Sequence, residues 1–404
     1  MKTLSSARHL RLLYRFTRCC PLGHIRILKL TLLYLGIVLP FLTQAQGLER
    51  FVEFFTLHPN RVAARQDSAI YPSKLILTPL VAFSPETSLE FGVGAKYLFK
   101  FRQSGPETRT SNMPLSFTYT LNNQILIFSG YEIFFNQEKY MLTGNARFKV
   151  FPQRFYGVGR DSPKSAEEEY LFSQLLIEPI FLKQVGLRYL FLGAGVRYNW
   201  VSNVTFEEES ALAVSDISGA NGSTSVGAEL ALVYDSRDNI LTAHRGWYTE
   251  LTHGFYGKVL GGTHQFQLTR IDVRKFVPLA RHRTLAFQFL ASFSYQDVPL
   301  SELSGLGGDD IMRGYYAGRY LDNHSIALQA EYRFRLYQRL GAVVFAGGGD
   351  VAHQVSEFAF GNIRPTVGIG LRFLIDKTED LNLRFDYGFG RRTQNYYLQL
   401  AEAF

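Results

Sequence analysis

Acidic residues are missing from the first 45 positions of this 404-residue chain, where seven basic residues lie. The whole chain has 43 basic and 35 acidic residues, for a formal net charge of +8. Removing the seven from the 43 leaves 36 basic against 35 acidic residues, a net charge of +1. The excess positive charge therefore belongs to the N-terminal segment, and no nucleic-acid partner is expected. The seven residues are Lys2, Arg8, Arg11, Arg15, Arg18, Arg26 and Lys29.

Long hydrophobic runs are also scarce. Residues 30–42 form an apolar run, which follows the positive region and precedes Thr43-Gln44-Ala45. This order is typical of a secretory signal peptide at residues 1–45, with cleavage after Ala45. A membrane anchor is the alternative, but Pro40 and a run shorter than ~18 residues argue against it. After residue 46 no apolar run approaches that length.

Cysteine occurs only as Cys19 and Cys20, which both precede the predicted cleavage site. The mature chain would contain none, which excludes disulfides, zinc–thiolate sites and thiol chemistry. Residues 46–73 are expected to form a short N-terminal segment and linker, with an amphipathic helix at 47–57. This stretch is too short for a folded domain of its own.

Catalytic signatures are missing as well. No GxSxG or HExxH pattern occurs. The glycine-rich residues 305–308 lack the lysine and the strand–helix setting of a phosphate loop. The sequence therefore predicts no enzyme, no cofactor and no metal site. A barrel hydrolase with a serine and a histidine on adjacent strands is the enzyme alternative.

Aromatic residues and glycine are abundant, with 34 Phe, 23 Tyr and 35 Gly, which favours a large β-sheet protein. From residue 74 onward, apolar residues alternate with polar residues, as in 325–334 and 381–390. One face of each predicted strand is apolar and aromatic, while the other is polar, charged or glycine. This pattern is typical of a transmembrane antiparallel β-barrel, with lipid outside and water inside. A soluble sandwich or solenoid that buries the apolar face is the alternative fold.

The alternation predicts sixteen strands in a barrel that covers residues 74–404. An even number places both ends of the barrel in the periplasm, with longer loops at 152–167, 204–223 and 352–362 outside. The chain is therefore expected in the outer membrane of a Gram-negative bacterium, in contact with outer-membrane lipids and lipopolysaccharide. The expected strands are 74–84, 87–102, 113–122, 124–135, 138–151, 168–182, 186–203, 224–235, 246–257, 262–276, 283–296, 324–336, 341–351, 363–375, 380–390 and 394–404.

A glycine-rich loop at residues 306–320 follows the eleventh predicted strand, which makes it the sixth extracellular loop. Glycine permits backbone conformations that are closed to other residues. Its centre holds Ile311, Arg313, Gly314 and Tyr315. An arginine can make a planar, forked contact with a carboxylate.

Three segments resemble the barrel domain of the BamA/TamA-type outer-membrane assembly superfamily, also called the bacterial surface antigen family. The first is the sequence from Ile311 to Tyr315, similar to the family's hydrophobic-x-Arg-Gly-aromatic signature. The second resembles the periplasmic turn between the eighth and ninth strands, and the third an outer-membrane sorting signal. The second consists of Tyr234, Asp235, Arg237, Asp238, Asn239 and Gly246; the third has Tyr396, Leu398, Leu400 and terminal Phe404 on one face.

The resemblance implies that Arg313 folds back into the lumen and pairs with acidic residues on the next two strands. Glu331 faces inward by alternation and matches the first acidic position. At the second position Gly347 stands where the family has aspartate, and Asp386 is the expected substitute. The family usually carries periplasmic POTRA domains, for which residues 46–73 offer no room.

The resemblance also implies a function: insertion or translocation of proteins at the outer membrane through a seam between the first and last strands. Pro79 in the first strand lacks an N–H, and Glu402 is expected on the same face as Leu398 and Leu400; both would weaken this seam. The expected partners are unfolded outer-membrane proteins or a larger assembly machine. A passive pore or structural barrel, plugged by its inner loop, is the alternative.

Overall fold

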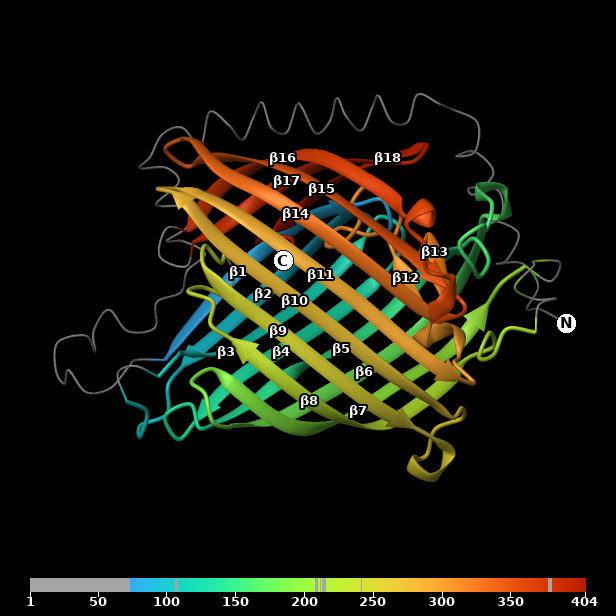
Figure 1. Cartoon of the computed structure of the whole chain (residues 1–404), viewed down its shortest axis with the longest axis horizontal. Helices are drawn as coiled ribbons and strands as arrows, with labels where there is room; N and C mark the ends of the chain where they lie inside the picture. The colour runs from blue at the N-terminus through green and yellow to red at the C-terminus, as the bar shows by residue number, and fades with distance from the viewer. Residues whose placement is uncertain are drawn as a thin grey trace, which may run out of the picture. The chain divides into compact units, whose positions relative to one another are not determined.

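The computed structural model describes residues 73–404, except 106–107, 208–209, 211, 213–215, 241 and 377–379. The predicted signal peptide at 1–45 and the segment at 46–72 lie outside the described residues. No helix in the described part of the chain has the length and apolarity needed to cross a membrane. The described residues instead form strands joined by loops (Figure 1).

Sixteen antiparallel strands close into one barrel, which confirms the predicted fold class. Each strand pairs with its neighbour along the chain, except that β11 pairs with β14 because the short strands β12 and β13 form a separate sheet. The barrel strands are β1 (Lys74–Ser84), β2 (Ser88–Phe99), β3 (Ser111–Thr120), β4 (Ile125–Phe135), β5 (Tyr140–Phe155), β6 (Glu168–Gln184), β7 (Leu190–Thr205), β8 (Ser223–Asp235), β9 (Gly246–Tyr256), β10 (Phe266–Ala280), β11 (Arg283–Gln296), β14 (His324–Tyr337), β15 (Leu340–Ala352), β16 (Arg364–Asp376), β17 (Leu381–Gly390) and β18 (Thr393–Leu400).

The observed strands follow the sequence alternation closely. Strands β1 and β11 have the predicted bounds, and the others differ by one to four residues at one or both ends. The sequence missed the two-stranded sheet of β12 (Ser304–Leu306) and β13 (Tyr320–Asp322), because strands of three residues show no usable alternation. The predicted last strand, 394–404, was too long, since β18 ends at Leu400.

Alternation separates an apolar outside from a polar inside. Val93, Leu115 and Phe117 are exposed on the outside of the barrel, as lipid-facing residues must be. Gln329 and Glu331 are buried on the inside. Because both faces are specified, a register slip of one residue would turn charged side chains toward lipid.

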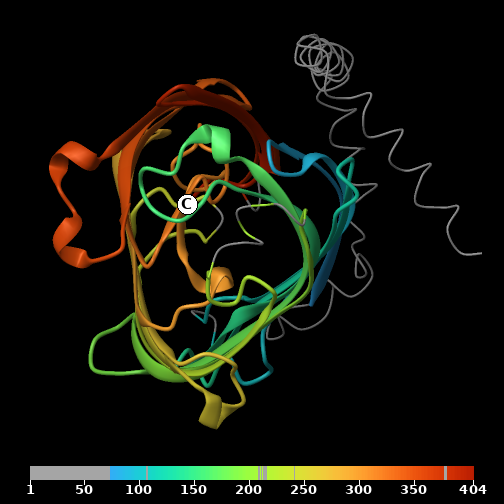
Figure 2. The same ribbon diagram turned by 90° about the vertical axis from the view of Figure 1, so that its right-hand side faces the viewer.

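The two ends of the barrel differ in loop length. We call the end with the long loops the outer end and the end with the short turns the inner end. Figure 2 views the barrel from the outer end, where several loops lie across the opening. Two of these loops, β7–β8 and β11–β14, share an apolar cluster with the outer end of β5. The cluster contains Phe155, Leu212, Ala220, Leu300 and Leu321.

Candidate functional site

The loop between β11 and β14, residues 297–323, folds into the lumen and presses against β17. Gly314 at its centre has a φ of +110°, a conformation that side chains with a Cβ rarely adopt. A Cβ at Gly388 would lie 2.6 Å from the carbonyl carbon of Arg313. One at Gly390 would lie 2.5 Å from the Tyr315 ring. Because Gly388 and Gly390 have no Cβ, the loop can pack directly against the backbone of β17.

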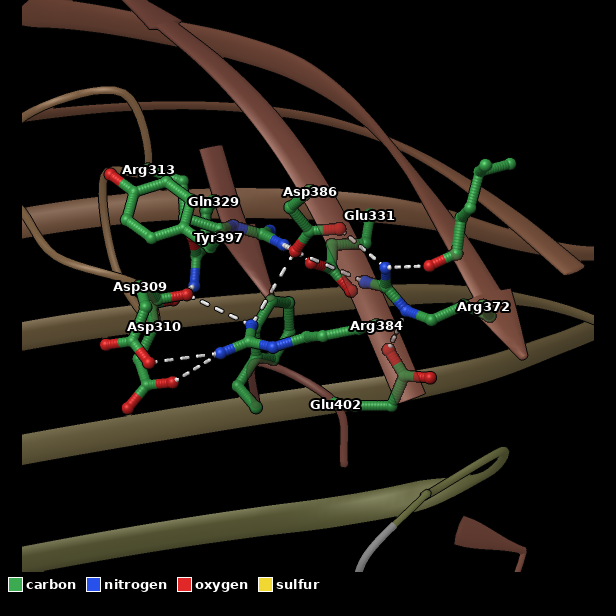
Figure 3. A network of polar contacts seen from close by, with 12 residues as sticks. Asp309, Asp310, Arg313, Gln329, Glu331, Arg372, Arg384, Asp386, Tyr397 and Glu402 are labelled. Carbon is green, nitrogen blue, oxygen red and sulfur yellow. Dashed lines mark hydrogen bonds and ion pairs between the residues drawn. The ribbon is translucent and has the colours of Figure 1, made fainter. Parts of the chain in front are cut away.

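Arg313 makes two ion pairs in the lumen, and its side chain is 0% exposed, as are both partners (Figure 3). Its Nη2 donates to Glu331 on β14, the residue expected from alternation. Its Nη1 lies 2.5 Å from Asp386 Oδ2 on β17. The guanidinium also stacks over the Phe345 ring, 3.7 Å from its centroid. Asp386 thus supplies the second carboxylate that Gly347 lacks.

Three further arginines extend this ion-pair network toward the inner end. Arg333 Nε lies 2.7 Å from Glu331 Oε2, and Arg372 Nη1 lies 2.5 Å from Asp386 Oδ1. Arg384 on β17 reaches back to the loop, where it bonds the Asp309 carbonyl oxygen at 3.0 Å. Positive and negative groups alternate through the network, so no buried charge stands alone. The labelled network in Figure 3 joins β14, β16, β17 and the loop.

The backbone of the motif is bonded to the last strand, β18. Gly314 N donates to Tyr397 Oη at 3.0 Å, and Tyr397 Oη donates to the Tyr315 carbonyl at 3.2 Å. Asn395 Nδ2 donates to the Gly314 carbonyl at 2.9 Å. Ile311 packs against the apolar cluster around the buried Tyr315. The loop is therefore attached to a strand that borders the seam.

A second anchor, which the sequence analysis missed, holds the same loop to the opposite wall. Glu302 in the one-turn helix η3 (Leu300–Glu302) is buried. It accepts hydrogen bonds from Arg197 Nη1 at 2.5 Å and Asn199 Nδ2 at 2.6 Å, both on β7. Alternation on β7 could have placed Arg197 and Asn199 inside, but nothing in the loop sequence pointed to Glu302.

The predicted turn motif forms a compact β8–β9 connection at the inner end. Asp235 pairs with Arg237 Nε at 2.9 Å and with Arg109 Nη1 at 3.0 Å. Asp238 Oδ1 accepts from the His244 amide at 2.9 Å. Asn239 Oδ1 accepts from the Thr242 amide at 3.0 Å, and Gly246 has a φ of +109°. Tyr234, the remaining motif residue, is half-buried opposite Leu190 on β7.

This turn reaches the β16–β17 turn on another part of the barrel rim. Thr242 Oγ1 donates to the Asp380 carbonyl at 2.7 Å. His244 Nε2 lies 2.7 Å from Asp380 Oδ2, and this hydrogen bond raises the pKa of His244 above its ordinary value. The two turns are thereby tied together at the inner end.

The C-terminal residues correct one prediction. Glu402 and Phe404 do not continue the face of Leu398 and Leu400, because Ala401 has a φ of +69° and turns the chain inward. Glu402 instead lies 2.7 Å from Arg372 Nε. Phe404 is buried against Phe276, and its carbonyl accepts from Arg333 Nη2 at 2.9 Å. Glu402 therefore belongs to the ion-pair network and does not face lipid.

The seam between β1 and β18 is the shortest pairing in the barrel wall. Its register consists of one pair, Phe83 opposite Leu398. On its other side, β1 pairs with β2 at every residue from Lys74 to Ser84. One stacked ring pair, Phe83 with Tyr396 at 4.5 Å, reinforces the seam. Pro79 pairs with Val93 on β2, and its missing N–H leaves β1 one donor short.

A luminal cavity of about 580 Å³ lies along the wall that includes β5, β6 and β10. Its lining carries both signs of charge, including Glu178, Arg147 and Arg270. Among the residues that the structure describes, no cluster of three His, Cys, Asp or Glu could hold a metal ion. The cavity is therefore a polar, mixed-charge space rather than an apolar ligand pocket.

Comparisons with known proteins agree with this architecture. The Omp85 superfamily domain matches residues 91–404. BamA from Haemophilus ducreyi lacking POTRA domains 1–3 is similar in structure, with a TM-score of 0.55 at 12% identity over 88% of this chain and 77% of that chain. CdiB from Acinetobacter baumannii has a TM-score of 0.54 at 10% identity, over 82% of this chain and 66% of that chain.

A search of curated proteins finds no match. At 10–12% identity, the two solved structures show a shared fold and nothing more. The family match carries more, because it covers most of the sequence, from β2 to the C-terminus. The chain therefore belongs to the Omp85 superfamily, as a sixteen-stranded barrel of the Gram-negative outer membrane.

Proposed function

We propose that this barrel assists the insertion or translocation of proteins at the outer membrane by opening between β1 and β18. The observation that carries the proposal is the single register pair that joins these strands. A client strand needs an unpaired edge to which it can bond by strand addition. Breaking one pair exposes two such edges, whereas opening β1 from β2 would break eleven residues of pairing.

The motif loop supports this proposal by holding the seam-side wall in shape. Arg313 ties the loop to β14 and β17, and Tyr397 ties it to β18. These contacts join β14, β17 and β18 through one loop. The same loop also reaches across the seam, since Ala317 N donates to Glu86 Oε1 in the β1–β2 turn at 2.6 Å, so this bond must break or move when β18 separates from β1. We propose this fixing role for Arg313 and its partners, and no catalytic role for any residue.

Reconstitution tests the proposed function. The purified full chain in lipid vesicles should accelerate the insertion of an unfolded outer-membrane protein relative to empty vesicles. Depletion in cells should lower the amounts of many other outer-membrane proteins. Unchanged insertion rates together with an unchanged outer-membrane protein profile would contradict the proposal.

A plugged pore or structural barrel is the second candidate, and the double anchoring of the loop favours it. Arg313 and Glu302 hold one loop against two opposite walls, as a fixed plug would be held. In this case Glu302→Gln should raise the conductance of single barrels in planar bilayers, because the charged contact with Arg197 is lost. Client insertion would then be absent in both the wild type and the variant. If the barrel assists insertion, its partners are unfolded client proteins or a larger assembly machine. Membrane lipids surround the barrel under either candidate function.

A further inference from the structure

Two loops at the outer end turn away from the barrel axis and do not cover the lumen. One is the β9–β10 loop with the one-turn helix η2 (Lys258–Leu260). The other is the β15–β16 loop with η4 (Val355–Glu357) and η5 (Phe360–Asn362). In Figure 2 both project sideways beyond the ring of strands, the gold η2 loop below it and the orange-red loop to its left. Their position raises the question of what surrounds them.

The tips of both loops are apolar and exposed. Val259 is fully exposed and Leu260 about half exposed. Phe360 is 92% exposed, and Val355 is also exposed. Loops that fold over the lumen behave differently, since they bury apolar residues such as Leu300. Among the described residues, the two most exposed large apolar side chains are thus Val259 and Phe360, both at loops that turn outward to a position that lipid can reach.

Both loops join the lipid-facing surface of the barrel. In the first, Thr263 N donates to the Thr224 carbonyl at 2.7 Å, and Thr224 lies opposite the exposed Trp200. Tryptophan on the outside of a barrel is typical of the membrane–water boundary. Lys258 is exposed beside Val259 and can extend its ammonium group toward lipid phosphates.

The second loop makes a direct contact with the outer wall. A Cβ at Gly348 would lie 2.7 Å from Ile363 Cγ2, so Ile363 packs closely on that glycine. Gly348 lies opposite Leu328, an exposed residue of the lipid-facing surface. The apolar tips therefore extend an existing lipid-facing surface.

The positions of the two loops on the barrel wall favour lipid over a protein partner as the contact of their tips. Along the barrel wall, the strands β9–β10 and β15–β16 are separated by β11 and β14. One protein partner would have to cover two separate loops, whereas a lipid leaflet surrounds the barrel on every side and meets both tips at once. We infer that both loops are interfacial anchors, whose apolar tips enter the headgroup and upper acyl region of the outer leaflet.

Spin labelling tests this inference. Cys19 and Cys20 are replaced by serine, and single cysteines are introduced at Val259 or Phe360 of the full chain. The labelled barrel in phosphatidylcholine vesicles should be more accessible to oxygen than to a water-soluble nickel chelate at both sites. Asp161, an exposed residue of an inward loop, is the aqueous control, and Leu328 is the lipid control.

Equal accessibilities at Val259, Phe360 and Asp161 would overturn the inference. Protection of the two tips in native outer membranes, but in neither phosphatidylcholine vesicles nor vesicles that contain lipopolysaccharide, would also overturn it, because a protein would then be the occupant. A second measurement keeps the tip aromatic: Phe360→Trp in a Trp200→Phe, Trp247→Phe background. Brominated phosphatidylcholine should quench this tryptophan strongly, and a lack of quenching would contradict lipid insertion.

Discussion

At the scale of single residues, Arg313 is the centre of the site. Its guanidinium satisfies two buried carboxylates on different strands, and Glu331 and Asp386 have no access to water in its place. A buried charge left with no partner costs about 3–5 kcal/mol. Without Arg313, Glu331 would still pair with Arg333 and Asp386 with Arg372, so the cost of removing Arg313 is below that range. The Arg313 side chain therefore helps to hold the loop against β17.

Arg313→Ala should loosen the loop and lower the stability of the folded barrel, by less than the about 3–5 kcal/mol of a fully unpaired buried charge, because Arg333 and Arg372 still pair with the two carboxylates. The measurement is the temperature at which the barrel loses its heat-modifiable migration on gels. Arg392→Ala is the matched control, because Arg392 is exposed in the β17–β18 turn. If both variants unfold at the wild-type temperature, the ion pairs do not stabilise the loop.

The sequence placed Glu331 and Asp386 inside because both lie on strands with a clear two-residue period. It failed at Glu402 and Phe404, because a single left-handed residue, Ala401, ends that period. It also missed Glu302, which lies in a loop where no period exists. The two-residue period thus shows which side chains of a barrel strand face inward, because one face meets lipid and the other meets water. It does not place side chains in loops or beyond the end of a strand.

At the scale of elements, the turns at the inner end and the β11–β14 loop in the lumen matter most. The β8–β9 turn is tied to the β16–β17 turn by the His244–Asp380 contact. Strands β12 and β13 pair with each other near the two ends of the β11–β14 loop, and both were too short to be predicted. The strands themselves were predictable, since each must present one apolar face over its whole length.

The turn contact predicts a pH dependence. The pKa of His244 is raised by its hydrogen bond with Asp380, so the protonated histidine is favoured in the folded state. The stability it contributes is fully present below the unfolded pKa of about 6.5 and is lost as pH rises through the higher folded pKa. Urea unfolding should show this loss in the wild type and a smaller one in His244→Gln. Equal pH dependence in both proteins would exclude His244 as the cause.

At the scale of the whole molecule, orientation follows from the loop lengths. A cysteine at Asn221, in the β7–β8 loop at the outer end, should be labelled by an impermeant reagent in intact cells. A cysteine at Lys377, which lies outside the described residues in the β16–β17 turn, should be labelled only after the outer membrane is opened. Labelling in intact cells at position 377 but not at position 221 would show that the assigned orientation is wrong.

The proposed function depends on opening of the β1–β18 seam, so a disulfide that holds the seam closed should block it. The register places Phe83 opposite Leu398, so a cysteine at each of these positions forms the test pair. Antiparallel partners have Cα atoms about 4.5–5.5 Å apart, which suits a disulfide. Phe83 also lies opposite Leu89 on β2, so one cysteine at position 83 can serve both a test pair and a control pair.

The most direct measurement is therefore client insertion by the Phe83→Cys/Leu398→Cys barrel, oxidised and reduced, with Cys19 and Cys20 replaced by serine. Oxidation should abolish insertion, and reductant should restore it, because the seam can then open again. The Phe83→Cys/Leu89→Cys control locks β1 to β2 and should stay active in both states. Full insertion activity in the oxidised seam-locked barrel would contradict opening between β1 and β18.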